Sequence, residues 1–132
     1  MSNGEKIPPA DMEAAIQRDG LFEQVMVHGE GHPYLVALVV VNAEAWARFA
    51  LEVGVRTDMP ESLHDTRIEQ RVLQRVAEQI KEFPGYARVR RVLLLTEPWS
   101  IDNGLLTPTL KIKRARIFAR YENEIAELYK GH

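Results

Sequence analysis

The nearly unbroken apolar run "PYLVALVVV" at residues 33–41 restricts the fold of this 132-residue chain more than any other feature. A strand with one face in water alternates apolar and polar residues, whereas this run is apolar at almost every position. It therefore predicts a central strand that is covered on both faces. The preceding run, "LFEQVMVHG" at 21–29, also favours a strand, and Gly29 and Gly31 supply a turn between the two. We expect an antiparallel hairpin.

Prolines, glycines and one asparagine mark the ends of the first two expected helices. The first helix opens after Pro8 and Pro9 and stops at Gly20. The second is "AEAWARFALEV", with Asn42 as its N-cap and Gly54 as its stop. A polar connector, "RTDMPESLHD", follows the second helix.

Two longer helices are expected further along the chain. Apolar residues recur every three or four positions over about 61–83, which predicts one helix with a single buried face. The segment 114–130 predicts a C-terminal helix for the same reason. Between them, "RVRRVLLLT" predicts another strand, and "IDNGLL" predicts a tight hairpin around Asn103 and Gly104. The two buried stripes are Ile68, Val72, Val76, Ile80 and Phe83, and Ile117, Tyr121, Ile125 and Leu128.

This mixed order of elements predicts an α+β fold. We expect a small mixed domain in which an N-terminal helix, an antiparallel hairpin and a C-terminal helix surround a small central sheet flanked by helices. A chain of 132 residues is sized for one domain with one core.

Several classes of site are excluded by what the sequence lacks. There is no cysteine, so disulfides and thiolate metal sites are absent, and the chain fits a reducing cytoplasm. No apolar run approaches the roughly 18 residues of a membrane span, and residues 1–15 lack the apolar core segment of a secretory signal, so we expect a cytoplasmic location. The serines lie in no hydrolase motif, and phosphate-binding glycine fingerprints are missing. No metal site is expected, because the histidines at 28, 32, 64 and 132 have no metal-ligand spacing.

The basic residues are concentrated in one segment. Residues 88–120 hold eight lysines and arginines against two acidic residues, so this segment carries +6 although the whole chain carries −2. The motifs of nucleic-acid-binding domains are missing, so we expect no nucleic acid partner. A phosphorylated small molecule or the surface of a partner protein fits the charge.

Two lysines in this segment lie close to a stiff turn. In an extended stretch Lys111 and Lys113 point to one side and Ile112 to the other. Pro108 stiffens the approach. One lysine could therefore anchor while the other reaches into a site. From the residues alone, however, such a cluster is more often a solvated surface patch.

The segment "NGLLTPTLKIKR" at 103–114 resembles the C-terminal lysine motif of adenylate-forming enzymes, in the form T-P-T-x-K-[hydrophobic]-[K/R]-R found in long-chain fatty acid–CoA ligases. The wider superfamily has glycine before this lysine, and Leu110 favours the long-chain branch. Two further segments agree: "SNGEKIPPADMEAA" resembles the motif near the family's hinge, and "LFEQVMVHGEGHPYLVALVVVN" resembles the hairpin that follows it.

The resemblance implies that residues 1–132 are the mobile C-terminal domain of such a ligase, with the large N-terminal domain absent. The family converts a fatty acid and ATP to acyl-AMP and pyrophosphate, and then transfers the acyl group to CoA. It implies a catalytic role for Lys111 in adenylation, supported by Lys113 and Arg114. It also implies that Gly4, Glu5 and Lys6 line the path of CoA.

Partners and cofactors follow from the same resemblance. ATP, CoA and the fatty acid are substrates, and the partner is the N-terminal adenylation domain of the same polypeptide, which would also bind Mg²⁺. No cofactor is expected in the isolated domain, which we expect to be inactive and to be a fragment of its parent. Peripheral association of the parent with membranes is compatible with this assignment. The alternative is a stand-alone module that binds anions or a partner without catalysis.

Overall fold

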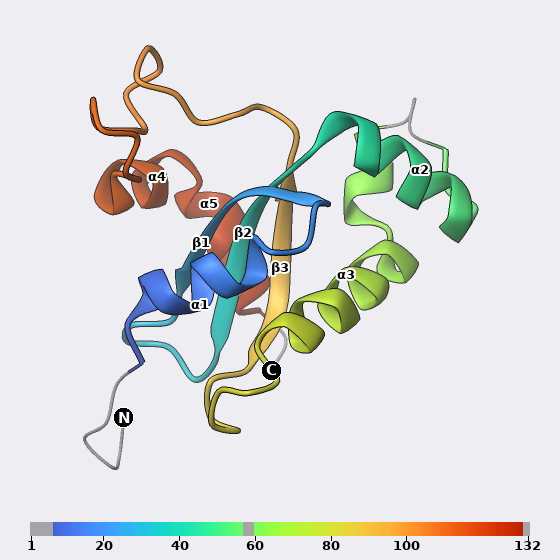
Figure 1. Ribbon diagram of the computed structural model, residues 1–132, viewed down its shortest axis with the longest axis horizontal. Helices are drawn as coiled ribbons and strands as arrows, with labels where there is room; N and C mark the ends of the chain where they lie inside the picture. Colours follow the sequence, from blue (N-terminus) through green and yellow to red (C-terminus); the bar gives the residue numbers. More distant parts are fainter. Residues whose placement is uncertain (1–6, 57–59, 131–132) are drawn as a thin grey trace.

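A three-stranded sheet forms the centre of the molecule. The structure, a computed structural model, describes residues 7–56 and 60–130. The strands are β1 (Phe22–His28), β2 (Leu35–Val41) and β3 (Val89–Leu95), in the order β1-β2-β3. β1 and β2 pair in an antiparallel manner, as predicted, whereas β2 and β3 pair in a parallel manner (Figure 1). β2 is therefore the central strand.

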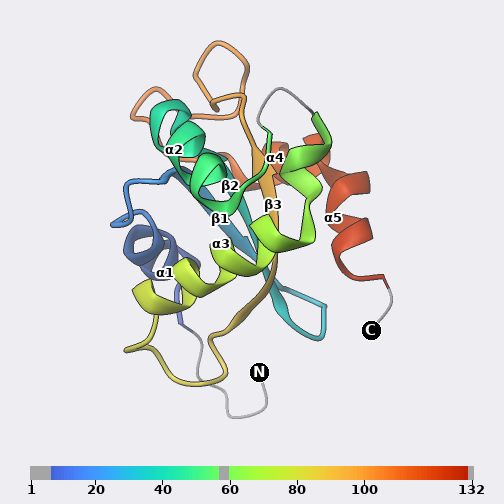
Figure 2. The same cartoon turned by 90° about the vertical axis from the view of Figure 1, so that its right-hand side faces the viewer.

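Helices cover both faces of this sheet. Helices α1 (Pro9–Ile16), α2 (Ala43–Val53) and α3 (Thr66–Gln79) lie on one face, and α4 (Arg114–Arg120) and α5 (Glu122–Leu128) lie on the other (Figure 2). The 3₁₀ helix η1 (Pro60–His64) joins α2 to α3. The connection from β2 through α2, η1 and α3 to β3 is the crossover that a parallel pair requires. The fold is thus the small mixed α+β domain predicted from the sequence.

Consecutive residues of β2 supply two separate hydrophobic cores. Residues 36–40 are all 0% exposed. Ala37 and Val39 belong to the core beneath α1, α2 and α3, which also contains Trp46. Leu38 and Val40 belong to the core beneath α4 and α5, which also contains Trp99. The run is apolar at every position because alternate side chains point into different cores.

The second helix has the predicted ends, and the third begins later than predicted. The Oδ1 of Asn42 accepts a hydrogen bond from the Ala45 N–H at 3.0 Å, and Gly54 ends α2 in the left-handed conformation with φ 89°. The helix predicted over 61–83 is only Thr66–Gln79. Asp65 is its N-cap and accepts a hydrogen bond from the Arg67 N–H at 2.8 Å, because a short acidic side chain caps a helix better than it continues one.

The predicted C-terminal helix is divided into two short helices. The backbone of Tyr121 lies at φ −113° and ψ 24°, outside the helical region, and separates α4 from α5. Tyr121 is only 8% exposed, and the rest of its predicted stripe, Ile117, Ile125 and Leu128, is buried with it. The packing of this stripe therefore tolerates a bend that the periodicity did not indicate. Within the described residues, no helix is long and apolar enough to cross a membrane.

Candidate functional site

A three-residue loop presents Lys111. The backbone N–H of Leu110 donates to the Thr107 carbonyl, and the N–H of Thr107 donates to the Lys111 carbonyl, both at 2.8 Å. Leu106 and Ile112 form a β-bridge at the base of this loop. We call residues 106–112 the lysine hairpin. Its hydrogen bonds are those of a hairpin with Pro108 at the first loop position, where a fixed φ is favourable.

The hairpin predicted around Asn103 and Gly104 is therefore wrong in position. Gly104 does adopt a turn conformation, with φ 81°, but no strands flank it. Instead, the Oδ1 of Asn103 accepts a hydrogen bond from the Ser100 N–H at 2.9 Å, and the Oγ of Ser100 accepts one from the Asn103 N–H at 3.1 Å. The side chain of Asn103 thus closes a local turn, and this competes with the strand pairing that the Asn-Gly dipeptide usually initiates.

Leu110 has the backbone conformation that glycine would favour. Its φ of 67° is the one positive φ of a non-glycine residue in the described part of the chain. The left-handed region costs a leucine roughly 1 to 2 kcal/mol, because Cβ approaches the following carbonyl. Its side chain is 66% exposed, so burial does not offset this strain. The hydrogen bonds of the lysine hairpin maintain the conformation.

The hydroxyl of Thr107 holds the backbone of Lys111 directly. Its Oγ1 accepts a hydrogen bond from the Lys111 N–H at 3.0 Å and lies 3.1 Å from the Oγ1 of Thr109. Thr107 thus fixes the peptide group of the lysine itself. Neither hydroxyl was predicted to take part, although the T-P-T spacing of the motif contained the signal.

The segment that leads to the lysine hairpin is anchored to the sheet. Gln24 of β1 accepts from the Trp99 N–H at 2.7 Å and donates to the Trp99 carbonyl at 2.9 Å. The indole of Trp99 is 2% exposed and lies in the core beneath α4 and α5. The lysine hairpin therefore rests on a fixed base although it lies on the surface.

The side chains of the motif lysines differ in exposure. Lys111 is exposed, and its ammonium forms no hydrogen bond or ion pair with any described residue. Ile112 packs against the core beneath α4 and α5, whereas Lys113 is half-buried and its N–H donates to the Leu105 carbonyl at 2.9 Å. The alternation of Lys111 and Ile112 agrees with the prediction. A free cation on a fixed backbone is suited to an anionic group of another molecule.

Arg114 is paired within the fold. Its guanidinium forms a two-pronged ion pair with the carboxylate of Glu13 in α1, with N–O distances of 2.6 and 2.7 Å. The predicted residues Gly4, Glu5 and Lys6 lie outside the described residues. They immediately precede the segment that enters α1.

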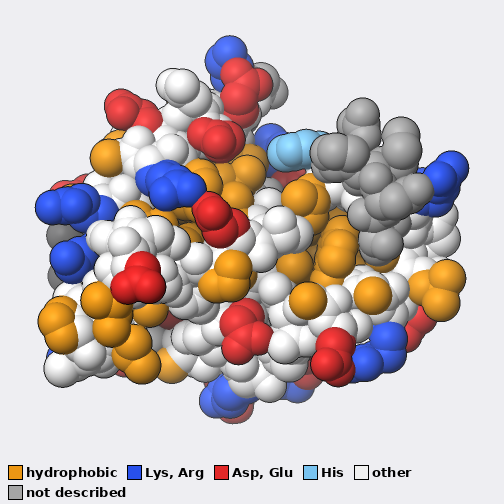
Figure 3. Space-filling model, turned by 90° about the horizontal axis from the view of Figure 1, so that it is seen from above, with side chains coloured by type: hydrophobic (Ala, Val, Ile, Leu, Met, Phe, Trp, Pro, Cys, Tyr) orange, Lys and Arg blue, Asp and Glu red, His pale blue; other side chains and the backbone are white. Residues whose placement is uncertain are grey.

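The basic segment does not form one patch. Arg91, Arg114 and Arg120 are engaged by Glu69, Glu13 and Glu97, respectively. Seen from above, basic and acidic side chains are interspersed, with apolar side chains between them (Figure 3). Within this basic segment, the residues that form no ion pair with a described residue are Arg88, Arg90, Lys111, Lys113 and Arg116.

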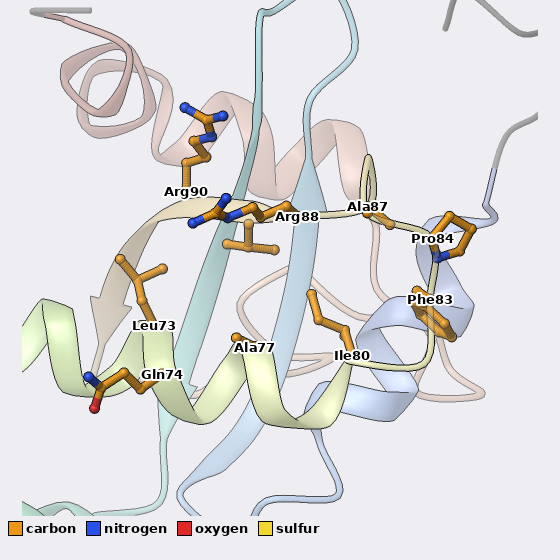
Figure 4. Close-up of a pocket in the computed structure, with 11 residues that line it drawn as sticks. Leu73, Gln74, Ala77, Ile80, Phe83, Pro84, Ala87, Arg88 and Arg90 are labelled. Atoms are coloured by element: carbon orange, nitrogen blue, oxygen red, sulfur yellow. The ribbon is translucent and has the colours of Figure 1, made fainter.

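Arg88 and Arg90 belong to a different region from the lysine hairpin. They border a groove of about 510 Å³ between α3 and the segment that enters β3, and Arg90 points away from α3 (Figure 4). The groove is lined mainly by apolar side chains, including Leu73, Ala77 and Ile80, and by no acidic or nucleophilic side chain. The chain reaches the lysine hairpin only after β3 has run along the edge of the sheet to its other end (Figure 1).

Two of the histidines, His28 and His32, are part of an aromatic cluster. The ring of His32 stacks on Tyr129 at 3.8 Å, and His28 lies 4.8 Å from the Phe118 ring, measured between centroids. Burial lowers the pKa of His28, as does the nearby His32, whereas Glu30 acts in the opposite direction. Within the described residues, no three side chains are arranged to hold a metal ion.

Comparisons with known proteins agree over the whole length. Residues 1–132 match the family model described as AMP-binding enzyme C-terminal domain. The chain is 33% identical over 132 residues to the probable acyl-activating enzyme 16, chloroplastic, of Arabidopsis thaliana. This match covers 98% of this chain and 18% of that protein. It is 32% identical over 134 residues to long-chain-fatty-acid–CoA ligase 5 of Rattus norvegicus, covering 99% and 20%.

A solved structure has the same fold. The A domain of carboxylic acid reductase from Segniliparus rugosus, in complex with AMP and a co-purified carboxylic acid, superimposes with a TM-score of 0.78 at 26% identity. The match covers 98% of this chain and 19% of that one. The chain thus spans about a fifth of the length of each of these proteins.

Proposed function

Because the chain belongs to the family of AMP-binding enzyme C-terminal domains, we propose that it acts as the C-terminal domain of an AMP-forming long-chain fatty acid–CoA ligase, with Lys111 as its catalytic cation. The observation that carries this proposal is the lysine hairpin. Its hydrogen bonds fix the peptide group of Lys111 and leave the ammonium without a partner among the described residues.

The proposed reaction has two steps. A carboxylate oxygen of the fatty acid attacks the α-phosphorus of ATP, which forms acyl-AMP and releases pyrophosphate. The thiol of CoA, losing its proton, then attacks the acyl carbon, which forms the thioester and releases AMP. In the first step negative charge accumulates around the α-phosphate. A fixed ammonium at that point stabilises the transition state more than the ground state, because its attraction grows as charge is transferred.

The other parts of the active site are assigned to a partner. The residues that would bind ATP, the acyl chain and Mg²⁺ belong, in this proposal, to an N-terminal adenylation domain of the same polypeptide. This agrees with the lengths of the relatives, because the chain spans only about a fifth of each of them. The long stem of lysine suits a domain that delivers a compact charge into a site formed mostly by other residues.

The segment before α1 has the second role in this proposal. Gly4, Glu5 and Lys6 would line the path of the pantetheine arm of CoA, where a residue without Cβ lets a thin chain pass close to the backbone. The alternative, a stand-alone anion-binding module, is less well supported. The basic residues are divided between the groove and the lysine hairpin, and three of them are neutralised by glutamates.

The test is the substitution Lys111→Ala in the full-length ligase, with each half-reaction measured separately. Pyrophosphate release from palmitate and ATP should fall by on the order of a hundredfold to a thousandfold, as when one transition-state donor is removed. Formation of acyl-CoA from supplied acyl-AMP should change little. Lys113→Ala, the matched control, should have a much smaller effect on adenylation. If both half-reactions survive in Lys111→Ala, Lys111 is only a surface lysine.

A second measurement tests the requirement for the partner domain. The 132-residue chain alone, incubated with ATP, palmitate and CoA, should produce no acyl-CoA. Turnover by this chain alone would contradict the assignment of the substrate pockets to the partner.

A further inference from the structure

Glu13 differs from every other charged side chain in the described part of the chain, because it alone is buried, at 5% exposure. Its Oε1 accepts a hydrogen bond from Arg114 at 2.6 Å, and its Oε2 accepts one from Arg114 at 2.7 Å and one from the Val27 N–H at 2.8 Å. A buried carboxylate is costly unless its oxygens are satisfied. The three bonds satisfy it and join α1, β1 and α4 at one point.

Arg114 occupies a position that its charge disfavours. It is the first residue of α4, whose first turn holds no acidic residue and whose N-cap, Lys113, forms no side-chain capping bond. The N-terminus of a helix is the positive end of its dipole, so cations there are unfavourable. The carboxylate of Glu13 supplies the negative charge that this helix start lacks in its own sequence.

The same contact lies close to the end of the lysine hairpin. Arg114 follows Lys111 by three residues, and the base of the hairpin is held by the bridge between Leu106 and Ile112. The Lys113 N–H then donates to the Leu105 carbonyl at 2.9 Å. Arg114, the next residue, is held by its ion pair with Glu13. The chain is therefore held on the C-terminal side of Lys111 by a residue that precedes it by about a hundred positions.

We propose that Glu13 is a positioning residue for Lys111, acting through Arg114; this rests on the function proposed above for Lys111. The ion pair connects α1 to the start of α4, two residues after the lysine hairpin. A loss of the pair would let the start of α4 shift and would misplace the ammonium.

The test is Glu13→Gln in the full-length ligase, since glutamine keeps the shape of the side chain and an acceptor for Val27. The kcat of adenylation should fall about tenfold to a hundredfold, the effect of a displacement of about 1 Å at a catalytic group. The KM values for ATP and palmitate should stay constant. Glu97→Gln is the matched control, because it breaks the exposed pair with Arg120 of the same helix and should leave kcat unchanged.

A double-mutant cycle separates positioning from general stability. If Glu13 acts through Lys111, Glu13→Gln should have no further effect on adenylation in the Lys111→Ala enzyme. An equal loss in both backgrounds would overturn the proposal, as would an unchanged kcat in Glu13→Gln. If Glu13→Gln does not fold, Arg114→Lys is used in the same cycle, because it keeps both charges and loses the two-pronged geometry.

Hydrogen exchange distinguishes this proposal from the proposed function. In the 132-residue chain, Glu13→Gln should speed exchange of the Lys113 N–H, whereas Glu97→Gln should not. Normal adenylation by Lys111→Ala would refute the function of Lys111. Unchanged exchange in Glu13→Gln would refute its hold on the lysine hairpin, whatever the activity of Lys111→Ala.

Discussion

β2 and the lysine hairpin are held in place by different forces. Residues 36–40 of β2 have no exposed surface, and both neighbouring strands bond to this strand. In the lysine hairpin, by contrast, Leu110 is 66% exposed and local hydrogen bonds fix the backbone. Burial gives stability, whereas local hydrogen bonds orient a side chain that must stay accessible. Substitutions in the two regions should therefore affect different quantities.

The largest effect on stability is expected from Leu38→Ala. Removing this side chain, which is 0% exposed, should lower the free energy of unfolding by about 2 to 5 kcal/mol, because the tightly covered site cannot collapse fully. Urea denaturation measures this change. Leu51→Ala is the control, since Leu51 is 80% exposed and its loss should change stability by less than about 0.5 kcal/mol. Equal effects of the two substitutions would contradict the central position of β2.

Thr107→Val should have a smaller effect on stability and a larger one on activity. Valine keeps the shape but loses the hydroxyl that accepts the Lys111 N–H, so unfolding should become easier by about 1 kcal/mol. Adenylation by the full-length ligase should slow by on the order of tenfold, because the peptide group of Lys111 is released. Thr107→Ser should restore activity. Thr109→Val should act weakly, and a stronger effect there would assign the holding role to Thr109.

Leu110→Gly should cost little or no stability, unlike most large-to-small substitutions. Glycine relieves the strain at φ 67°. It also makes the unfolded chain more flexible, and this added conformational entropy lowers stability by about 0.5 to 1 kcal/mol. The two effects nearly cancel, so stability should change by less than about 0.5 kcal/mol or should rise slightly. Leu110→Val should destabilise, because β-branched residues tolerate positive φ poorly. Thermal unfolding compares the two, and a clear loss in Leu110→Gly would show that the exposed leucine makes a stabilising contact.

The smallest effect is expected from pH, and it involves neither β2 nor the lysine hairpin. The folded state lowers the pKa of His28 from 6.5, mainly through burial. Between the lowered pKa and 6.5 the unfolded chain binds a proton that the folded chain does not bind, so stability should fall as pH falls through this interval. Melting temperatures at about pH 7.5 and about pH 5.5 measure the trend. His28→Phe should weaken it; an unchanged slope would assign it to other groups.

The regions that depend on hydrophobic pattern could be predicted from sequence. The run at 33–41 indicated a strand covered on both faces, and Asn42 and Gly54 indicated the ends of α2, because burial and capping act locally and leave clear patterns. The bend at Tyr121 and the start of α3 at Asp65 were missed. At these positions tertiary packing and capping, and not the apolar periodicity, decide where a helix begins or bends. The periodic pattern alone therefore does not predict them.

The candidate site could be predicted only in part. Lys111 was identified through its motif, but its partners within the fold could not be. The carboxylate of Glu13 lies about a hundred residues from Arg114 in the sequence, and its neighbours in α1 do not distinguish it from a surface glutamate. The one local sign was an arginine at the start of a helix, a place that its charge disfavours. Contacts of this kind follow from topology, which lets Glu13 of α1 and Arg114 of α4 meet beside β1 although the two helices cover opposite faces of the sheet.

The two tryptophans are divided between the two cores, and this gives the molecule a built-in spectroscopic probe. Trp46, in α2, lies in the core beneath α1, α2 and α3, whereas Trp99, in the segment that leads to the lysine hairpin, lies in the core beneath α4 and α5. Replacing Trp46 by phenylalanine would leave Trp99 as the single tryptophan, in the core that supports Lys111. Its emission would then report the docking of that segment separately from the unfolding of the rest of the sheet. Tryptophan fluorescence could therefore show whether this segment detaches before the whole domain unfolds.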